Sequence, residues 1–242
     1  GNNDFMLAAS SPTGPAFEGA QISAGQRAAP GAIERVRIDP VTYETIFSVV
    51  GSNLWSNNKN FKDEIKKTGI TGICGSGIIE AVGEMFLAGI IKSDGSINGD
   101  LQNSTKKVQK DGRTYKFEIC KNVIIYQNDI RAIQLAKAAL NAGFKLLMKK
   151  AKVTDINKVI LAGAFGSHID PKYAMILGIV PDCNLENVIA AGNSAGTGAR
   201  MALLNINYRK EIEDTVTKIE KIETAIEKDF QDFFVDAMSF PH

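Results

Sequence analysis

The sequence is poor in the residues that most often hold metals. It has three cysteines and two histidines among 242 residues. Cys74, Cys120 and Cys183 lack the paired C-x2-C spacing of a zinc or iron–sulfur site, and an odd number of cysteines does not make a disulfide framework. His168 and His242 cannot form a histidine-rich centre without help from scattered carboxylates. We therefore expect reduced thiols and no metal bound by these residues.

The chain also lacks an excess of charge and long apolar runs. It has 28 Lys and Arg against 27 Asp and Glu, so its formal net charge is +1. No surplus positive field is available to hold a nucleic acid or an anionic membrane. No run approaches the roughly 20 apolar residues that span a bilayer, and the start does not resemble an export signal. We expect a cytoplasmic protein with no nucleic-acid partner and no membrane partner.

The first residues suggest that the sequence is a piece of a longer protein. Residue 1 is Gly, not Met, and the turn-forming run Gly-Asn-Asn-Asp leads directly into the apolar residues 5–9. The chain thus begins as if on the tip of a hairpin. The alternative is a short tag remnant ahead of a complete gene.

The first half of the sequence predicts β-hairpins. Residues 34–39 and 43–50 are β-prone and are joined by a turn that contains Pro40. Residues 106–110 and 114–120 flank an Asp-Gly turn, which predicts a second hairpin. We expect residues 92–127 to form a β insertion.

Helical periodicity begins at the second glycine-rich turn. From Ser76 the apolar residues recur on one helix face and predict a helix that ends near Gly89. A strand at 123–126 and a long helix at 130–151 follow, and residues 128–129 are its candidate cap.

The most regular part of the chain is a crossover between residues 159 and 204. Two apolar runs, 159–162 and 188–191, read as buried strands, and each is followed by a glycine-containing loop and a helix. Asp170-Pro171 is the expected start of the first helix. This order predicts a parallel crossover with ligand loops at the carboxyl ends of the strands. Beyond it, residues 212–222 read as a helix and 218–224 also as a polar edge strand, before a terminal helix at 230–238.

Four glycine-containing loops are candidates for ligand binding. They lie at 11–15, 74–77, 163–167 and 192–196. Glycine lets backbone N–H groups approach a ligand, and a helix N-terminus offers unpaired donors with the positive end of the helix dipole. Such loops suit phosphates and nucleotide sugars, although a glycine before a helix more often serves turn geometry. Together the loops point to a nucleotide.

Several familiar catalytic motifs are absent. The sequence has no G-x-x-x-x-G-K-[ST] phosphate loop, no complete dinucleotide fingerprint and no G-x-S-x-G nucleophile elbow. No histidine is evidently placed to activate Ser76, which argues against a hydrolase triad. Cys74 is more simply a small residue packed under a helix, and His168 is more simply a hydrogen-bonded structural residue.

Six blocks of the sequence, in the same order, resemble the reductive activators of corrinoid proteins. These are ferredoxin-containing ATPases that serve corrinoid-dependent methyl transfer, and the resemblance runs nearly end to end. The blocks are A-A-S-S-P-T-G-P-A-F-E-G-A (8–20), Q-R-A-A-P-G-A-I-E (26–34), G-I-C-G-S-G-I-I-E (72–80), L-A-G-A-F-G (161–166), S-A-G-T-G-A-R (194–200) and F-P-H (240–242).

The resemblance implies an α/β fold of the acetate kinase, sugar kinase, heat-shock chaperone and actin type (ASKHA). Two ribonuclease H-like, actin-like ATPase lobes would close on ATP, and residues 1–242 would be the C-terminal lobe, with a mixed sheet flanked by helices and inserted β-hairpins. The strand and loop at 161–166 would contact adenosine, and the helix at 193–204 would close the lobes. The residues that would face the nucleotide are Gly163, Ala164, Phe165, Gly166, Gly75, Ser76, Gly77, Ser11, Thr13, Gly14 and Asn193.

Parts that the resemblance calls for are missing from the sequence. The [2Fe-2S] domain with its C-x4-C-x2-C ligands and the first-lobe D-x-G-T phosphate loop are absent, and a second D-x-G-T loop would lie immediately before Gly1. ATP, Mg²⁺ and the [2Fe-2S] cluster are therefore expected for the full-length protein. We expect the fragment alone to bind ATP poorly and to hydrolyse none, because nothing evident holds Mg²⁺ or orients water.

By this resemblance, the full-length protein uses ATP and an iron–sulfur cluster to reduce a Co(II) corrinoid protein to Co(I), and it forms a homodimer. One alternative is another ASKHA member, such as an activator of acyl-CoA dehydratases or a small-molecule kinase. The other is a non-catalytic adaptor that uses a degenerate nucleotide lobe to bind proteins.

Overall fold

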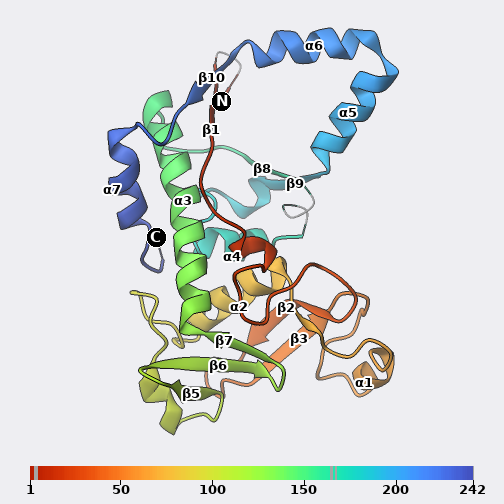
Figure 1. Ribbon diagram of the computed structural model, residues 1–242, viewed down its shortest axis with the longest axis vertical. Coiled ribbons are helices and arrows are strands. Elements are labelled where there is room, and N and C mark those ends of the chain that lie inside the picture. The colour runs from red at the N-terminus through yellow and green to blue at the C-terminus, as the bar shows by residue number, and fades with distance from the viewer. Residues whose placement is uncertain (3–4, 164–165, 167, 242) are drawn as a thin grey trace.

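The computed structural model describes residues 1–2, 5–163, 166 and 168–241. Ala164 and Phe165, which we predicted to contact adenosine, lie outside the described residues, as do Asn3, Asp4, Ser167 and His242. Figure 1 shows that one long helix, α3, runs between an upper part with β1, β10, β8 and β9 and a lower part with the remaining strands.

The first predicted hairpin is confirmed. Strands β2 (Ala32–Ile38) and β3 (Thr45–Val49) pair antiparallel, and β4 (Gly72–Ile73) pairs parallel with β2, so this sheet is mixed. A short helix, α1 (Phe61–Glu64), lies between β3 and β4. The predicted helix after Ser76 is α2 (Gly75–Leu87), which buries nearly all of its residues.

Gly77 explains how closely α2 approaches the sheet. A Cβ atom at this position would lie 2.3 Å from the carbonyl oxygen of Ile33 on β2, a distance that real Cβ atoms essentially never show. Only glycine therefore fits between the first turn of α2 and β2.

The second predicted hairpin is also present, within a three-stranded antiparallel sheet. It consists of β5 (Val108–Asp111), β6 (Thr114–Cys120) and β7 (Val123–Tyr126). A 3-10 turn, η2 (Gly99–Asn103), precedes it. Alternate residues of β6 and β7, such as Phe117 and Ile125, are buried, as the period-2 pattern of a half-buried sheet requires.

The long helix α3 (Gln127–Ala151) begins three residues earlier than predicted. Its N-cap is Tyr126, and the predicted cap residue Asp129 is instead the third helical residue. The Asp129 carboxylate accepts the backbone N–H of Tyr126 at 2.8 Å and that of Ser23 at 2.8 Å. The Asp129 carboxylate thus accepts backbone N–H groups at the helix start although Asp129 lies inside the first turn. The sequence pattern alone does not distinguish this position from the N-cap.

The crossover has the predicted order, but its strands are not buried. Strands β8 (Val159–Ala162) and β9 (Val188–Gly192) pair parallel, with α4 (Pro171–Ile176) and the 3-10 turn η3 (Leu185–Asn187) between them. Asp170 caps α4 by accepting the N–H of Lys172 at 2.9 Å. Ile160 is 58% exposed and Ile189 is 42% exposed. The prediction of buried strands is wrong for these residues because α5 (Ser194–Leu204) and α6 (Ile206–Val216) extend away from them (Figure 1) and bury none of their own residues.

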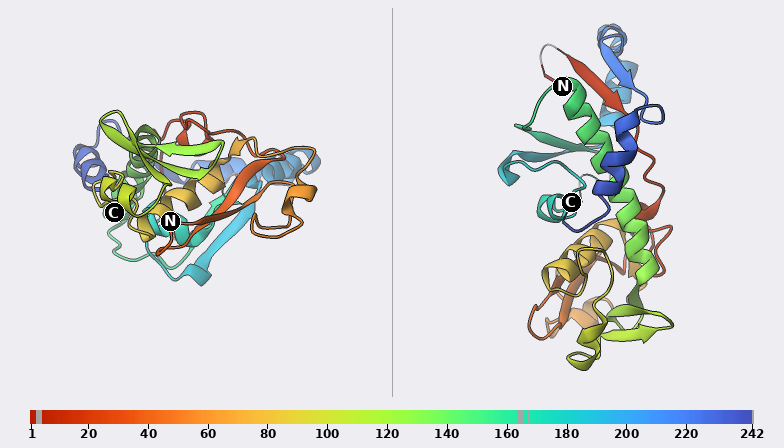
Figure 2. Two further views of the ribbon diagram at one scale, coloured as in Figure 1. Left: turned by 90° about the horizontal axis from the view of Figure 1, so that it is seen from below. Right: turned by 90° about the vertical axis from the view of Figure 1, so that its left-hand side faces the viewer.

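Both readings of the tail are correct in part, since α6 is followed by a strand, β10 (Ile219–Ile222). That strand pairs parallel with β1 (Met6–Ala9). The last helix, α7 (Lys228–Asp236), lies along α3 in both views of Figure 2 and in Figure 1, and Lys149 on α3 pairs with Asp229 at 2.7 Å. No helix in the described part of the chain combines the length and the apolar character that crossing a bilayer requires.

Candidate functional site

A cavity of ≈ 450 Å³ opens at the N-terminus of α2. Residues from three stretches meet there: 17–18 of the 3-10 turn η1 (Ala16–Glu18), 26–28 together with Glu34 on β2, and 74–76 at the start of α2. His168, which follows the glycine loop after β8, also lines the cavity. Of the four predicted loops, only the one at 74–77 supplies lining residues, and His168 directly follows the predicted loop at 163–167.

The first turn of α2 offers backbone donors to the cavity. Cys74 is the N-cap in an extended conformation, and its side chain makes no capping hydrogen bond. The intrahelical ladder begins where Ile78 N–H donates to the Cys74 carbonyl at 2.9 Å. Gly75 and Ser76 lie before that point and line the cavity. Their N–H groups and the helix dipole suit acceptor atoms or negative charge on a ligand.

Charged and apolar side chains are mixed around the cavity. Glu18, Arg27 and His168 are exposed and Glu34 is half-buried, whereas Phe17 is buried. The lining contains two carboxylates and one guanidinium, so it carries no excess of positive charge to hold a triphosphate. Apolar surface with a few polar groups is the usual lining of a small-molecule site. This lining suits the base and sugar of a nucleotide better than its phosphates.

Two ion pairs with one buried carboxylate fix α2 to the sheet below the cavity. Glu80 on α2 is fully buried, and its carboxylate lies 2.5 Å from Nη1 of Arg35 and 2.5 Å from Nη1 of Arg37, both on β2. The same carboxylate accepts the backbone N–H of Val36 at 3.0 Å. Burial lowers the pKa of Arg37, but the hydrogen bond and the charge of Glu80 outweigh it and raise that pKa. Arg37 therefore stays charged, and the contacts of Glu80 with β2 hold the start of α2 against that strand.

A second buried contact connects α2 to α4, the helix that follows His168. The hydroxyl of Tyr173 on α4 donates to Glu84 on α2, whose carboxylate also accepts the N–H of Ile38 at 2.8 Å. The guanidinium of Arg37 lies 5.2 Å from the centre of the Tyr173 ring. Burial, followed by the hydrogen bond to Glu84, raises the pKa of Tyr173, so its hydroxyl remains a donor. The two walls of the cavity, one on α2 and one before α4, are thus joined.

The remaining predicted residues lie away from the cavity lining. Gly77 packs against β2. Gly163, with φ of 98°, donates its N–H to the Gly192 carbonyl at 2.7 Å, and Gly166 is buried behind the carboxyl end of β8. Asn193 caps α5 by accepting the Gly196 N–H at 2.9 Å.

The first predicted loop also lies outside the lining. The hydroxyl of Ser11 packs onto α3 at Gly143, where a Cβ atom would meet it at 2.2 Å. Thr13 donates its hydroxyl to the Gly14 carbonyl, and Gly14 adopts a φ of 62°. Whether these residues face a nucleotide remains a prediction.

Sequence reasoning missed several residues that line the cavity. Phe17, Glu18, Arg27 and Glu34 all lie inside the two long blocks that carry the family resemblance, 8–20 and 26–34. The available signal was the presence of charged residues among small residues and turns in those blocks, since binding residues gather on such loops.

The described residues contain no group of three or more His, Cys, Asp or Glu side chains that could hold a metal ion. Cys74 is buried, and Cys120 and Cys183 are half-buried free thiols. Burial raises the pKa of Cys120.

Comparison with known proteins gives one matching family and several similar proteins. A protein-family model described as the C-terminal domain of RACo, the ASKHA domain, matches residues 1–242. A corrinoid activation enzyme, RamQ, of Eubacterium limosum is 36% identical over 94% of this chain and 37% of its own length. The [Co(II) methylated amine-specific corrinoid protein] reductase of Methanosarcina barkeri is 24% identical over 98% of this chain and 43% of its own length.

A solved structure shows the same fold. A reductive activator for corrinoid,iron-sulfur protein aligns with a TM-score of 0.85 and 30% identity, over 100% of this chain and 37% of that one. The chain therefore spans well under half of the length of the proteins it matches.

Proposed function

The chain belongs to the family of the RACo C-terminal ASKHA domain, and we propose that it is the ATP-binding part of an ATP-dependent reductive activator. The whole protein would reduce a Co(II) corrinoid protein to Co(I), with an electron from an iron–sulfur cluster held outside these residues. The names of the similar proteins, which are corrinoid activators and a Co(II) corrinoid protein reductase, support this proposal.

The observation that carries the nucleotide part of the proposal is the cavity at the start of α2. Its lining joins the Gly75–Ser76 turn to His168 beside the glycine loop after β8. In this arrangement the base and ribose occupy the mixed apolar and polar cavity, and the N–H groups of the first helical turn meet acceptor atoms of the nucleotide. Glu18 and Glu34 are placed to accept hydrogen bonds from sugar hydroxyls or base N–H groups.

The described residues do not fit a [2Fe-2S] cluster or a dedicated Mg²⁺ cage. A cluster needs four close ligands, and Cys74, Cys120 and Cys183 belong to separate elements without a ligand group around any of them. Mg²⁺ is usually held by carboxylates and substrate phosphates. The contribution of this chain is therefore to bind and orient the nucleoside, and no electron-transfer step is assigned to its residues.

Filling the cavity tests this proposal. Ala28 is an exposed lining residue, so Ala28→Trp in the whole protein adds bulk to the cavity without removing a core contact. We expect ATP affinity, measured by calorimetry, to fall at least tenfold and the ATP-dependent formation of Co(I), followed by corrinoid absorption, to fall with it. Ala225→Trp, at an exposed position on another part of the chain, should change neither.

Each possible outcome has a distinct meaning. ATP binding that is insensitive to Ala28→Trp contradicts the location of the site. ATP binding without any reduction of Co(II) corrinoid contradicts the activator role and favours another ASKHA activity. A whole protein that binds no ATP favours an adaptor.

We also propose that the whole protein is a homodimer in the cytoplasm. The apolar side chains of Leu203, Leu204 and Ile206 on α5 and α6 are 74%, 78% and 75% exposed, and large exposed apolar side chains that are close in sequence support an assembly. Light scattering of the whole protein should give twice the chain mass, and the mass of a monomer at all concentrations would contradict the proposal.

A further inference from the structure

The β insertion carries an unusual share of the positive charge of the chain. Its residues 106–121 contain six Lys or Arg against two Asp or Glu, although the whole chain has 28 against 27. The rest of the chain therefore has more acidic than basic residues. Figure 1 places the strands of this element, β5–β7, at the lower end of the molecule, away from α6 and β10. Positive charge is thus gathered at one end of a nearly neutral chain, where it can attract a partner of opposite charge.

Most of these cations have no acidic partner. Within the described part of the chain, Lys107 alone among the six forms an ion pair, with Glu44 at 3.8 Å. Glu118, one of the two acidic residues, accepts the amide of Gln109 at 3.3 Å. The other five cations, which form no ion pair there, are the exposed Lys106, Lys110, Arg113 and Lys121 and the half-buried Lys116. Like charges held together without counter-ions repel one another, so this cluster favours a role in binding.

The outer face of the β5–β7 sheet presents part of this charge. Lys116 lies opposite Tyr126 in the ladder, and its Nζ atom is 5.7 Å from the centre of the Tyr126 ring. The next pair along, Phe117 and Ile125, is buried, so Lys116 and Tyr126 point away from the core because side chains alternate along a strand. We call this surface and the two turns that flank β6 the basic face, with the residues Arg113, Lys116, Lys121 and Tyr126.

A polar hollow of ≈ 410 Å³ continues the basic face beside β7. Lys121, Asn122 and Tyr126 line it from the β insertion, and residues 23–25 and Thr71 line it from the other side. The Lys121 ammonium and the Asn122 amide donate no hydrogen bond to another side chain within the described part of the chain. Ammonium and amide groups are donors that suit carboxylate oxygens.

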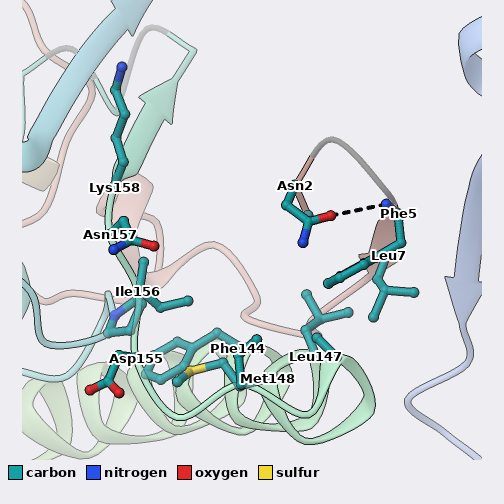
Figure 3. A pocket seen from close by; sticks show the side chains of 14 residues that line it. Asn2, Phe5, Leu7, Phe144, Leu147, Met148, Asp155, Ile156, Asn157 and Lys158 are labelled. Atoms are coloured by element: carbon teal, nitrogen blue, oxygen red, sulfur yellow. Dashed lines mark hydrogen bonds between the residues drawn. The ribbon is translucent and has the colours of Figure 1, made fainter.

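The polar hollow differs in character from the slot beside β1. Figure 3 shows that slot, of ≈ 360 Å³, with Phe144, Leu147 and Met148 of α3 forming an apolar floor. The slot and the polar hollow share no lining residue. The hollow beside β7 is therefore a separate surface, and its lining suits charged groups.

The polar hollow adjoins the nucleotide cavity. Gln26 lines the cavity, and its side-chain amide donates at 2.8 Å to the hydroxyl of Thr71, which lines the hollow. One hydrogen bond thus connects the walls of the two sites. A partner on the basic face would lie next to the bound nucleotide.

The width of the basic face fits a protein better than a small anion. Arg113 and Lys121 directly flank the seven residues of β6. At about 3.3 Å per strand residue, they lie roughly 25 Å apart. One small anion cannot touch both, whereas a folded protein buries about 800 Å² of each partner in an ordinary interface.

We propose that the basic face docks an acidic face of the corrinoid protein, an inference that rests on the proposed function. Carboxylates of the partner meet Arg113, Lys116 and Lys121, and one of them enters the polar hollow to accept from Lys121 and Asn122. Docking there places the partner beside the Gln26–Thr71 contact and therefore beside the nucleotide. Charge complementarity of this kind acts mainly on the rate of association and on the choice of partner.

Charge reversal in the whole protein tests the docking. Association with the Co(II) corrinoid protein is followed by stopped flow in the presence of ATP. We expect Arg113→Glu/Lys121→Glu to lower the association rate constant about tenfold at about 0.01 M salt. The difference should shrink at about 0.15 M salt, because the Debye length falls from about 30 Å to about 8 Å.

Two matched variants separate local charge from net charge and from packing. Lys210→Glu/Lys218→Glu makes the same change in net charge at exposed positions on α6 and directly before β10. It should change the rate constant by less than about twofold. Arg113→Lys/Lys121→Arg keeps the charge of the basic face and should keep the wild-type rate.

Three results would overturn the proposal. The first is an equal rate for the two charge-reversed proteins. The second is unchanged association with slower formation of Co(I), because the basic face would then serve the supply of electrons. The third is duplex DNA that binds the basic face as tightly as the corrinoid protein does. ATP affinity should be unchanged in every variant, so a wild-type protein that binds ATP but neither binds nor reduces the corrinoid protein contradicts the proposed function itself.

Discussion

At the scale of single residues, the buried side chain of Lys137 connects two distant parts of the chain. Lys137 on α3 is 0% exposed, and its ammonium donates to the carbonyls of Ala237 at 2.7 Å and Ser239 at 2.6 Å. It also lies 4.9 Å from the ring centre of Phe240. One buried lysine thus attaches the last residues of the chain to the middle of the longest helix.

The lowered pKa of Lys137 makes the stability of the folded chain depend on pH. Burial, followed by the charge of Lys145, lowers the pKa of Lys137 to about 8. Between pH 8 and 10.5 the unfolded chain keeps a proton that the folded chain has lost, so this group makes stability rise with pH in that window. From pH 7.5 to 9.5 the gain is roughly 2 kcal/mol.

Urea unfolding of the wild-type chain and of Lys137→Met at these two pH values checks this prediction. The variant should lack the gain, whereas Lys59→Met, at an exposed position, should keep it. A rise of the same size in Lys137→Met would mean that other groups cause it.

Individual site residues were only partly predictable. Gly75 and Ser76 were predicted to face the nucleotide because glycine before a helix is a visible signal, and both line the cavity. Glu18 and Glu34 were not found, since an exposed glutamate in a loop looks the same in sequence whether or not a cavity lies beside it. The meeting of residues 17–34 with His168 depends on contacts over more than 130 residues, which no local pattern records.

At the scale of elements, the junction between α2 and α4 is the feature on which the cavity depends. Tyr173 and Glu84 are both buried, and their hydrogen bond is a side-chain contact between the start of α4 and α2. Removing the hydroxyl leaves a buried carboxylate oxygen without its donor.

We expect Tyr173→Phe to lower the free energy of unfolding by about 1 to 3 kcal/mol. It should also weaken ATP binding by the whole protein severalfold, because His168 precedes α4. Tyr208→Phe, on the exposed helix α6, should affect neither quantity. Denaturant titration and calorimetry measure the two effects. A loss of stability with unchanged affinity would show that the position of α4 does not matter to the cavity.

Most elements were predictable because their signals are local. Asp170-Pro171 predicted the start of α4, and the Asp-Gly turn predicted the β5–β6 hairpin, since capping and turn residues act on their immediate neighbours. The burial of β8 and β9 was not predictable. An apolar strand is typical of a sheet covered on both faces, but the covering elements are not fixed by the sequence of the strand itself.

At the scale of the whole molecule, α3 is the common support of parts that do not pack into one continuous sheet. It packs against β1, contacts β7 through its first turn, and binds α7 and the C-terminal segment. The ASKHA resemblance correctly indicated the family and the fold. It did not indicate that β1–β10 and β8–β9 would form separate two-stranded sheets, because strand pairing depends on contacts between distant segments.

The pairing of β1 with β10 determines when this domain can finish folding. Met6 lies opposite Ile219, and Thr224 donates its hydroxyl to the carbonyl of Ser10, so one of the earliest strands pairs with one of the last. During synthesis on the ribosome, β1 must wait until nearly the entire domain has been translated before its partner exists. Contacts of such high sequence separation slow folding, and a cell that makes this protein must protect the waiting strand from pairing with its neighbours.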